Sequence, residues 1–160
     1  MIIGIVSDTH GHVEFTRPAV RMLESCEVQL VIHCGDIGST DIVGCFKPWP
    51  THFVFGNVDA DEEQLRKAIE SAGQTCHARF GTLELEGRRI AFLHGDDSSL
   101  MQQSIDGGQY DLLCYGHTHA AEQHRAGHTR VRNPGALFRA HPHSLAIVRL
   151  PQIEITHVTL

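Results

Sequence analysis

The sequence begins with MIIGIVSDTHGH, residues 1–12, in which a short apolar run ends abruptly in an aspartate and two histidines. The run Ile2 to Val6 is rich in β-branched residues, which favours a strand buried on both faces of a sheet. Asp8 and His10 follow it, a carboxylate and an imidazole two residues apart. Ligands bind at the carboxyl ends of strands in open α/β sheets. Either residue could also cap a helix, so this stretch alone is a weak signal.

The same pattern recurs four more times. Each time an apolar run ends beside a glycine, in side chains that can bind a metal: HCGD at 33–36, GNVD at 56–59, HGD at 94–96 and GHTH at 116–119. A tight turn with a helix cap explains any one of these motifs. Five coincidences of this kind are far less expected than one shared site. The candidate donors are Asp8, His10, Asp36, Asn57, His94, His117 and His119.

In this order, the motifs D-x-H, G-D, G-N-x-D, H-G and G-H-T-H resemble those of the calcineurin-like metallophosphoesterase superfamily. The short chain resembles its small single-domain prokaryotic phosphodiesterase branch. The motifs extend from Asp8 to His119, and Asn133-Pro134-Gly135 also fits. Chance matches to five ordered motifs are rare. The resemblance implies an α/β fold, a four-layer α/β/β/α sandwich of two mixed β-sheets flanked by helices.

The order of the expected elements agrees with that fold. Helical patterns cover 15–25, 39–46, 61–72 and 97–105, and the early ones alternate with strand-like runs. The later runs read as paired strands, over 82–86 and 89–93 with a turn at Gly87-Arg88, then 120–123 with 129–132, and 144–150 with 152–159. His33 lies inside a strand-like run and is expected to be packed. Seven further histidines have no strand-end context and are expected at the surface or in satisfied core positions: His52, His77, His124, His128, His141, His143 and His157.

The donors combine carboxylate, carboxamide and imidazole groups without a thiolate, which suits Mn²⁺, Fe or Zn²⁺ better than Ca²⁺. Seven donors are too many for one catalytic ion with an open position, but they suffice for two ions that share a carboxylate. The resemblance gives Asp8, His10 and His119 to one metal, gives Asn57, His94 and His117 to the other, and makes Asp36 the bridge. We therefore expect two divalent ions, with Mn²⁺ preferred and Fe, Zn²⁺ or Ni²⁺ as alternatives.

Two ions about 3.5–4 Å apart can hold a bridging hydroxide and clamp phosphoryl oxygens during in-line attack. We therefore expect a metal-dependent phosphoesterase that hydrolyses phosphodiesters with this hydroxide. The expected catalytic residues are Asp36, Asn57 and His94, and the expected substrate-binding residues are His12, Asn57 and Arg139. For His12 and Arg139, a purely solvent-facing position is an equal alternative.

One position departs from the family pattern. Larger relatives have a histidine after the asparagine of G-N, where it is thought to protonate the leaving oxygen, and small relatives often have a cysteine. Here that residue is Val58, which donates no proton. Protonation then falls to water, to His12 or to no group. Asp59, the next residue, is expected to orient a neighbouring ligand or to cap the following helix, and Ala136 replaces the family's usual serine after Asn133-Pro134-Gly135.

Two other functions stay open. A phosphomonoesterase of the same fold is the nearer one, and a non-catalytic interaction scaffold, like the retromer subunit of this fold, is the more distant one. The complete donor set weighs against the scaffold. The acidic balance, 13 Lys and Arg against 19 Asp and Glu, disfavours a nucleic-acid groove. The expected partner is a small phosphodiester or phosphomonoester, and a homo-oligomer stays open.

Length and composition place few further limits. The 160 residues fit one domain spanning 1–160. No apolar stretch approaches the roughly 18 residues of a membrane span, and no basic region precedes the first apolar run, so we expect neither a membrane partner nor a signal peptide. The five cysteines are odd in number and form no C-x-x-C pair, so neither a disulfide framework nor a structural zinc knuckle is indicated. A reducing, cytoplasmic location is therefore expected.

Overall fold

The computed structural model describes residues 1–160 as two mixed sheets flanked by four helices. The first sheet has the order β11-β10-β1-β2-β3-β4. Its strands are β1 (Ile2–Val6), β2 (Leu30–His33), β3 (Thr51–Phe53), β4 (Thr75–Cys76), β10 (Ser144–Arg149) and β11 (Glu154–Thr159). The second sheet has the order β5-β6-β7-β9-β8. Its strands are β5 (Phe80–Leu85), β6 (Arg88–Leu93), β7 (Leu112–Cys114), β8 (Glu122–Ala126) and β9 (Thr129–Asn133).

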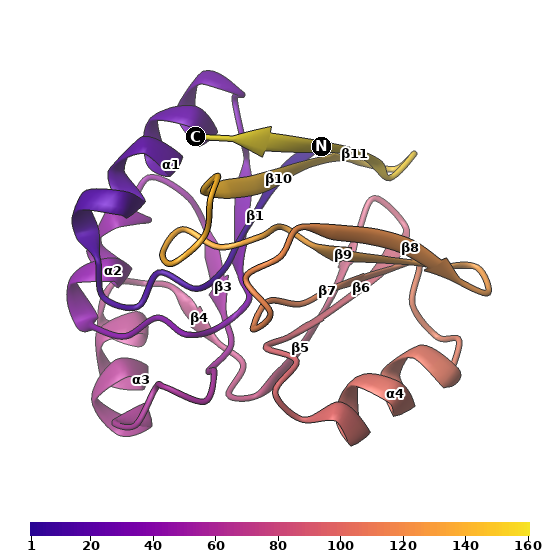
Figure 1. The fold of residues 1–160 in the computed structure, drawn as a ribbon, viewed down its shortest axis with the longest axis horizontal. Helices are drawn as coiled ribbons and strands as arrows, with labels where there is room; N and C mark the ends of the chain where they lie inside the picture. Colours follow the sequence, from indigo (N-terminus) through magenta and orange to yellow (C-terminus); the bar gives the residue numbers. More distant parts are fainter.

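The helices lie on the outer faces of the two sheets (Figure 1). They are α1 (Val13–Ser25), α2 (Thr40–Cys45), α3 (Glu62–Ser71) and α4 (Ser98–Asp106). The first three pack on the first sheet, and α4 packs on the second. This is the predicted α/β/β/α sandwich. None of the four helices is long and apolar enough to cross a lipid bilayer.

Successive side chains of a strand point to opposite faces of its sheet, so the apolar side chains of the first sheet contribute to two core layers. Ile3 and Ile5 of β1 lie between the sheets, in one cluster with Ile90 and Phe92 of β6. Val31 of β2 points the other way, into the cluster that the first three helices cover. The central strands are therefore buried on both faces, which explains their continuous apolar sequences.

Parallel pairing brings the chemically active loops to one edge. In the first sheet β1 runs parallel to β2, and β2 runs parallel to β3. In the second sheet β6 runs parallel to β7. Every metal-competent motif follows the carboxyl end of one of these five strands. The fold thus positions all five motifs on the same side of the sandwich (Figure 1).

The helix caps agree with the sequence patterns in two cases. The Asp61 carboxylate accepts a hydrogen bond from the Gln64 backbone N–H at 3.0 Å, before α3. The Asp97 carboxylate accepts one from the Leu100 N–H at 3.0 Å, before α4. Ser39 occupies the cap position of α2, but its hydroxyl makes no capping hydrogen bond.

Several predicted boundaries are wrong by one to three residues, including the starts of β5 and β11, and turn geometry explains the errors at the β5–β6 turn and at β8. The β5–β6 turn consists of Glu86 and Gly87, both with positive φ, because Arg88 already pairs with Leu85. The β8 strand covers 122–126 instead of 120–123, because Ala126 pairs with Thr129 across a turn at 127–128. Helix α1 begins two residues earlier than the pattern indicated.

His33, at the end of β2, is fully buried, as predicted. Its Nε2 lies 3.0 Å from the Thr9 hydroxyl, and its ring stacks on Phe53 with centroids 5.4 Å apart. Its Nδ1 is buried without a partner. Burial lowers the pKa of His33 to about 3, so the side chain stays neutral in the folded protein.

This burial predicts a contribution to acid unfolding. Below about pH 6.5 the unfolded chain protonates His33 and the folded chain does not, so stability falls as the pH falls. The contribution of one such group is about 1.4 kcal/mol per pH unit. His33→Gln keeps a donor for Thr9 but removes the titration. Urea unfolding between pH 6 and pH 4 should show a shallower dependence on pH for His33→Gln by about that amount. Equal slopes would contradict a neutral, buried His33.

Candidate metal centre

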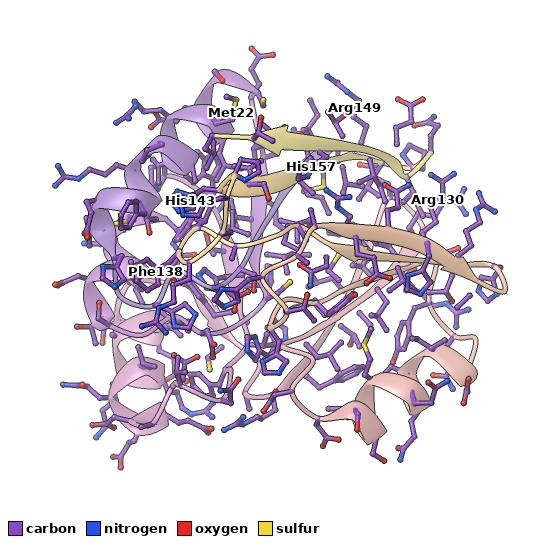
Figure 2. The ribbon with its side chains drawn as sticks, viewed as in Figure 1. Met22, Arg130, Phe138, His143, Arg149 and His157 are labelled. Atoms are coloured by element: carbon purple, nitrogen blue, oxygen red, sulfur yellow. The ribbon has the colours of Figure 1, made fainter.

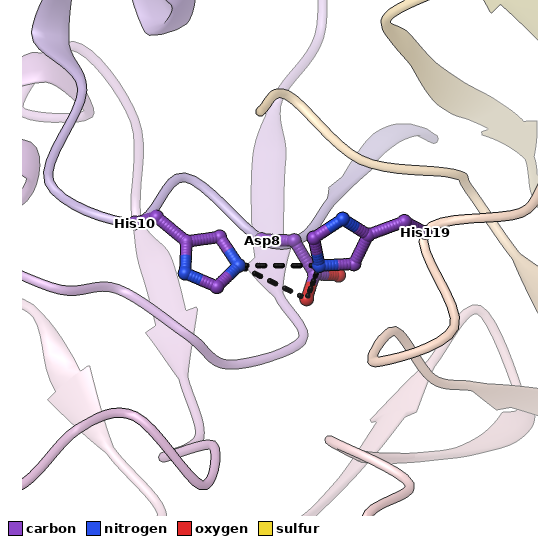
Figure 3. A group of neighbouring side chains, drawn as sticks. All are labelled: Asp8, His10 and His119. Atoms are coloured by element: carbon purple, nitrogen blue, oxygen red, sulfur yellow. Dashed lines mark hydrogen bonds and ion pairs between the residues drawn. The ribbon is translucent and has the colours of Figure 1, made fainter. Parts of the chain in front are cut away.

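Three predicted donors form the first group of the site (Figure 3). Asp8 and His10 follow β1, and His119 comes from the loop after β7. The His119 Nε2 atom lies 3.2 Å from Asp8 Oδ1 and 3.2 Å from His10 Nε2. The His10 Nε2 atom lies 3.8 Å from Asp8 Oδ1. Their ligand atoms all lie within 4.8 Å of one another, as one coordination sphere requires.

A second group lies beside the first. Asp8, Asp36 and His94 also place their ligand atoms within 4.8 Å of one another. The His94 Nε2 atom lies 3.2 Å from Asp36 Oδ2 and 3.1 Å from Asn57 Oδ1. Asp36 Oδ2 is in turn 3.5 Å from His10 Nε2, so its carboxylate reaches both groups. This position allows Asp36 to bridge two ions, and the bridging role stays a prediction.

His117 is the one predicted donor whose imidazole lies outside both groups of three. Its ring packs edge-on against the His94 ring, with centroids 5.1 Å apart. Its backbone N–H donates to Asp8 Oδ2 at 3.1 Å. The imidazole itself belongs to neither group of three. The structure therefore brings six predicted donors together and positions the seventh against them.

Hydrogen bonds fix the orientation of two imidazoles. His94 Nδ1 donates to the Cys34 carbonyl at 2.8 Å, and His119 Nδ1 donates to the Arg139 carbonyl at 3.3 Å. Metal-bound histidines characteristically donate their second nitrogen to a carbonyl in this way. In neutral His94 the Nε2 lone pair then faces only the oxygens of Asp36 and Asn57. Acceptors that face one another repel unless a cation lies between them.

One buried carboxylate oxygen of the site also lacks a hydrogen-bond donor. Asp8 is fully buried, and its Oδ1 atom has no hydrogen-bond partner, although Oδ2 accepts from His117. A buried carboxylate oxygen without a donor is strongly unfavourable. Asp36, the second carboxylate of the site, is 2% exposed. The orphaned oxygen and the mixed oxygen and nitrogen donors fit divalent cations of the Mn²⁺, Fe or Zn²⁺ type.

The pKa values of Asp36 and His94 move in opposite directions. Burial alone would raise the pKa of Asp36, but the hydrogen bond and charge of His94, the Val58 backbone N–H and the charge of His10 together outweigh it, and the pKa lies below its usual range. Burial alone would lower the pKa of His94, but the Asp36 and Asp8 carboxylates and the Cys34 carbonyl together outweigh it, and the pKa lies above its usual range. The carboxylate therefore stabilises positive charge at the imidazole. A bound cation supplies positive charge at this position in place of the proton.

Most of the donor residues have strained backbones. A left-handed conformation costs an ordinary residue roughly 1–2 kcal/mol, although Asp and His adopt it more readily than most. Positive φ angles occur at Asp8 (57°), His10 (47°), Asp36 (53°), His117 (67°) and His119 (58°). Such strain concentrates at functional sites, where the surrounding structure enforces it. The sequence motifs do not reveal this conformation.

Two motif glycines are required by close approach rather than by φ. A Cβ at Gly116 would lie 1.8 Å from the Ser7 hydroxyl and 2.6 Å from Asp8 Oδ2. A Cβ at Gly56 would lie 2.0 Å from Asp36 Oδ1. Any larger residue would therefore displace the carboxylates of the site.

Asp59 and Asn133 hold the loops to each other. The Asp59 carboxylate accepts from the backbone N–H of Gly56 at 2.8 Å, of Gly38 at 2.8 Å and of Ile37 at 3.2 Å. It thus joins the loop of Asn57 to the loop of Asp36, whereas Asp61 caps α3. The Asn133 amide donates to the Gly116 carbonyl at 2.7 Å, which fixes the loop of His117 and His119.

His12 and Arg139 lie at the rim on the His10 side. The His12 ring stacks on Phe138, with centroids 3.8 Å apart and planes 21° apart, and its Nδ1 lies 3.0 Å from Glu14 Oε1. The Arg139 guanidinium lies over the same Phe138 ring, 5.4 Å from its centroid. Sequence reasoning missed Phe138, because no motif marks it. The substrate-binding roles of His12 and Arg139 stay predictions.

Comparisons with known proteins agree with this geometry. The sequence profile of the calcineurin-like phosphoesterase superfamily domain matches residues 1–152. A phosphodiesterase of Methanocaldococcus jannaschii is 30% identical over 138 residues, which cover 84% of this chain and 83% of that protein. The solved structure of an archaeal phosphodiesterase has a TM-score of 0.92 at 27% identity, over 100% of both chains. A single mutant of Vps29 from Entamoeba histolytica shares the fold, with a TM-score of 0.71 at 16% identity over 100% of this chain and 99% of that one.

The profile match spans all five loops that carry the candidate donors. It confirms the family that the motifs D-x-H, G-D, G-N-x-D, H-G and G-H-T-H predicted. The chain belongs to the calcineurin-like phosphoesterase superfamily, a family of metal-dependent phosphoesterases.

Proposed function

We propose that the protein is a binuclear metal-dependent phosphodiesterase. The main support is the arrangement at His94, whose Nε2 faces the oxygens of Asp36 and Asn57 while its Nδ1 is held by the Cys34 carbonyl. Two overlapping donor groups with Asp8 in both, and with Asp36 between them, suit a pair of neighbouring ions better than one. The 30% identity to a phosphodiesterase supports the substrate class.

Each residue has a distinct part in this proposal. Asp8, His10 and His119 would hold one ion, Asn57, His94 and His117 would hold the other, and Asp36 would serve both. When bound, the two ions lower the pKa of water to yield a nucleophile at neutral pH and neutralise charge on the phosphoryl oxygens. Mn²⁺ is our preferred metal, with Fe, Zn²⁺ or Ni²⁺ as alternatives.

Charge favours an anionic phosphate ester at this site. Two divalent cations carry more positive charge than the buried carboxylates of Asp8 and Asp36 carry negative charge. The site therefore attracts a singly charged phosphodiester. At the rim, His12 and the Arg139 guanidinium would contact the substrate beside Phe138. A small substrate fits this arrangement, because the chain is acidic overall, which disfavours a polyanionic polymer.

The scaffold alternative has weaker support. The likeness to Vps29, at 16% identity, concerns the fold alone. A scaffold has no need to bury Asp8 with an orphaned oxygen or to hold donor residues in left-handed conformations. The donor set, complete at every motif position, favours catalysis.

A metal-binding comparison tests the bridging role of Asp36. Asp36→Asn should lose affinity for both ions, because a bridge serves both, and should lower turnover by orders of magnitude. His117→Ala should release mainly one ion. The matched control is His128→Ala, which removes an exposed histidine outside the site. Metal analysis of protein purified without chelator should give close to two ions per chain for the wild type and the control. Two tightly bound ions in Asp36→Asn would contradict the bridge.

A substrate panel tests the reaction class. With Mn²⁺ present, bis(p-nitrophenyl) phosphate should be hydrolysed with a higher kcat/KM than p-nitrophenyl phosphate. Chelation should remove both activities, and added metal should restore them. The reverse preference would favour the phosphomonoesterase, and the absence of turnover with every metal would favour the scaffold.

The leaving-group dependence tests the consequence of Val58. This side chain is 42% exposed and adjoins Asn57, so the site lacks a proton donor where larger relatives have one. A placed general acid is worth about 10²–10⁴-fold for poor leaving groups. Rates should therefore fall steeply across a series of diesters as the leaving group becomes more basic. Val58→His should flatten the slope, whereas Val58→Asn, polar but not acidic, should not.

His12→Ala is the control for an alternative proton donor. The His12 ring lies near the site, and its Nδ1 is paired with Glu14, which leaves Nε2 available. An unchanged slope in His12→Ala would show that departure is unaided. A shallow wild-type slope that survives His12→Ala would mean that another residue donates the proton.

A further inference from the structure

The β8–β9 hairpin has two chemically different faces. Ala126 and Val131 lie in the cluster that packs under α4. Because side chains alternate along strands, Arg125 on β8 and Arg130 and Arg132 on β9 share the opposite face. The pairing register places Arg125 directly across from Arg130. Three arginines therefore lie together on one face of one hairpin.

Two of these arginines reach across to the first sheet. The Arg130 guanidinium donates through Nη1 to the Ile153 carbonyl at 2.6 Å. The Arg132 guanidinium donates through Nη2 to His157 Nδ1, on β11, at 2.8 Å. Figure 2 shows Arg130 and His157 at this side of the sandwich. Both contacts are to neutral acceptors, so neither compensates the positive charge.

Arg132 is a buried cation without a counter-charge. Its residue is 4% exposed, its Nε has no hydrogen-bond partner, and no carboxylate lies within 4.0 Å of it. Burial lowers the pKa of Arg132, but a guanidinium stays charged at neutral pH. A buried, unpaired charge is strongly destabilising. The chain itself supplies no anion that compensates this charge, so a compensating anion has to come from outside the chain.

The neighbouring charges increase that demand. Like charges directly opposite each other on paired strands are destabilising, which applies to Arg125 and Arg130. Neither forms an ion pair, whereas Arg79 pairs with Glu62 and Asp96, and Arg88 pairs with Asp111. This concentration of positive charge occurs in a chain with a net charge of −6. Carboxylates are thus abundant on the chain but absent from this face of the hairpin.

We propose that Arg125, Arg130 and Arg132 form a second anion site, outside the metal centre, for the phosphate group of a small molecule. Guanidinium groups bind phosphate oxygens in bidentate pairs, and three of them suit a dianion. A polyanion fits less well, because the surrounding acidic chain repels it. None of the seven candidate metal ligands forms a hydrogen bond or ion pair with these arginines, so the site does not depend on the proposed catalysis.

Phosphate titration of the metal-loaded protein tests the site. Calorimetry with inorganic phosphate should resolve two sites, one at the metal centre and one at the arginines. Arg125→Gln combined with Arg130→Gln should weaken the second at least tenfold and leave diester hydrolysis unchanged at low phosphate. The control is Arg21→Gln combined with Arg149→Gln, which removes the same charge from exposed positions on α1 and β10.

Arg132→Met separates a ligand site from a structural arginine. Without phosphate, Arg132→Met should raise the Tm, because it removes an uncompensated buried cation. Added phosphate or sulfate should raise the Tm of the wild type through this site, and this part of the increase should be absent in Arg132→Met. A lower Tm with an undiminished phosphate effect would mean that Arg132 is structural and would overturn the proposal.

The remaining outcomes are also decisive. If only the arginine-dependent site binds phosphate and no ester is hydrolysed, this proposal holds and the proposed function fails. If replacement of the three arginines leaves the affinity for phosphate unchanged, the proposal is wrong. Arginine-dependent binding of single-stranded DNA or anionic vesicles, without binding of phosphate, would also overturn it, because the ligand would then be a macromolecule.

Discussion

The central constraint on this structure is the burial of two carboxylates, Asp8 and Asp36, at the ends of adjacent parallel strands. Backbone hydrogen bonds join their loops directly: Asp8 N–H donates to the Gly35 carbonyl at 3.1 Å, and His10 N–H donates to the Asp36 carbonyl at 2.9 Å. The register of β1 with β2 therefore fixes the separation of the two charges. Such a pair is stable only with positive charge beside it, and the imidazoles and the proposed ions supply that charge.

The loops of the second sheet form hydrogen bonds with the loops of the first sheet at the site. Asp8 receives the backbone N–H of His117 from the loop after β7, and the Cys34 carbonyl receives Nδ1 of His94 from the loop after β6. Each sheet thus orients a donor of the other, and the site depends on the packing between them. Gly116 allows this approach, since any side chain there would collide with Ser7 and Asp8.

The sequence predicted the layers, the family and the convergence of six donors, because buried parallel strands and ordered motifs leave strong local patterns. It did not predict the left-handed backbone at Asp8 or Asp36, the stack of His12 on Phe138, or the tie that Asp59 makes between two loops. These features depend on contacts between residues distant along the chain. The β8 boundary was wrong for a related reason: its pairing with β9, not local propensity, sets where it begins.

Val58 determines which leaving groups the proposed reaction favours. Every motif position holds a donor, so the proposed ions would still stabilise the phosphoryl charge, but Val58 offers no acid beside Asn57 for the departing oxygen. The exposed Val58 side chain also leaves that side of the site apolar and accessible. A substrate whose leaving group is already a stable anion needs no proton there. In the proposed mechanism such a substrate would be hydrolysed with the help of the ions alone, whereas an alkyl ester would also need a proton donor that Val58 does not supply.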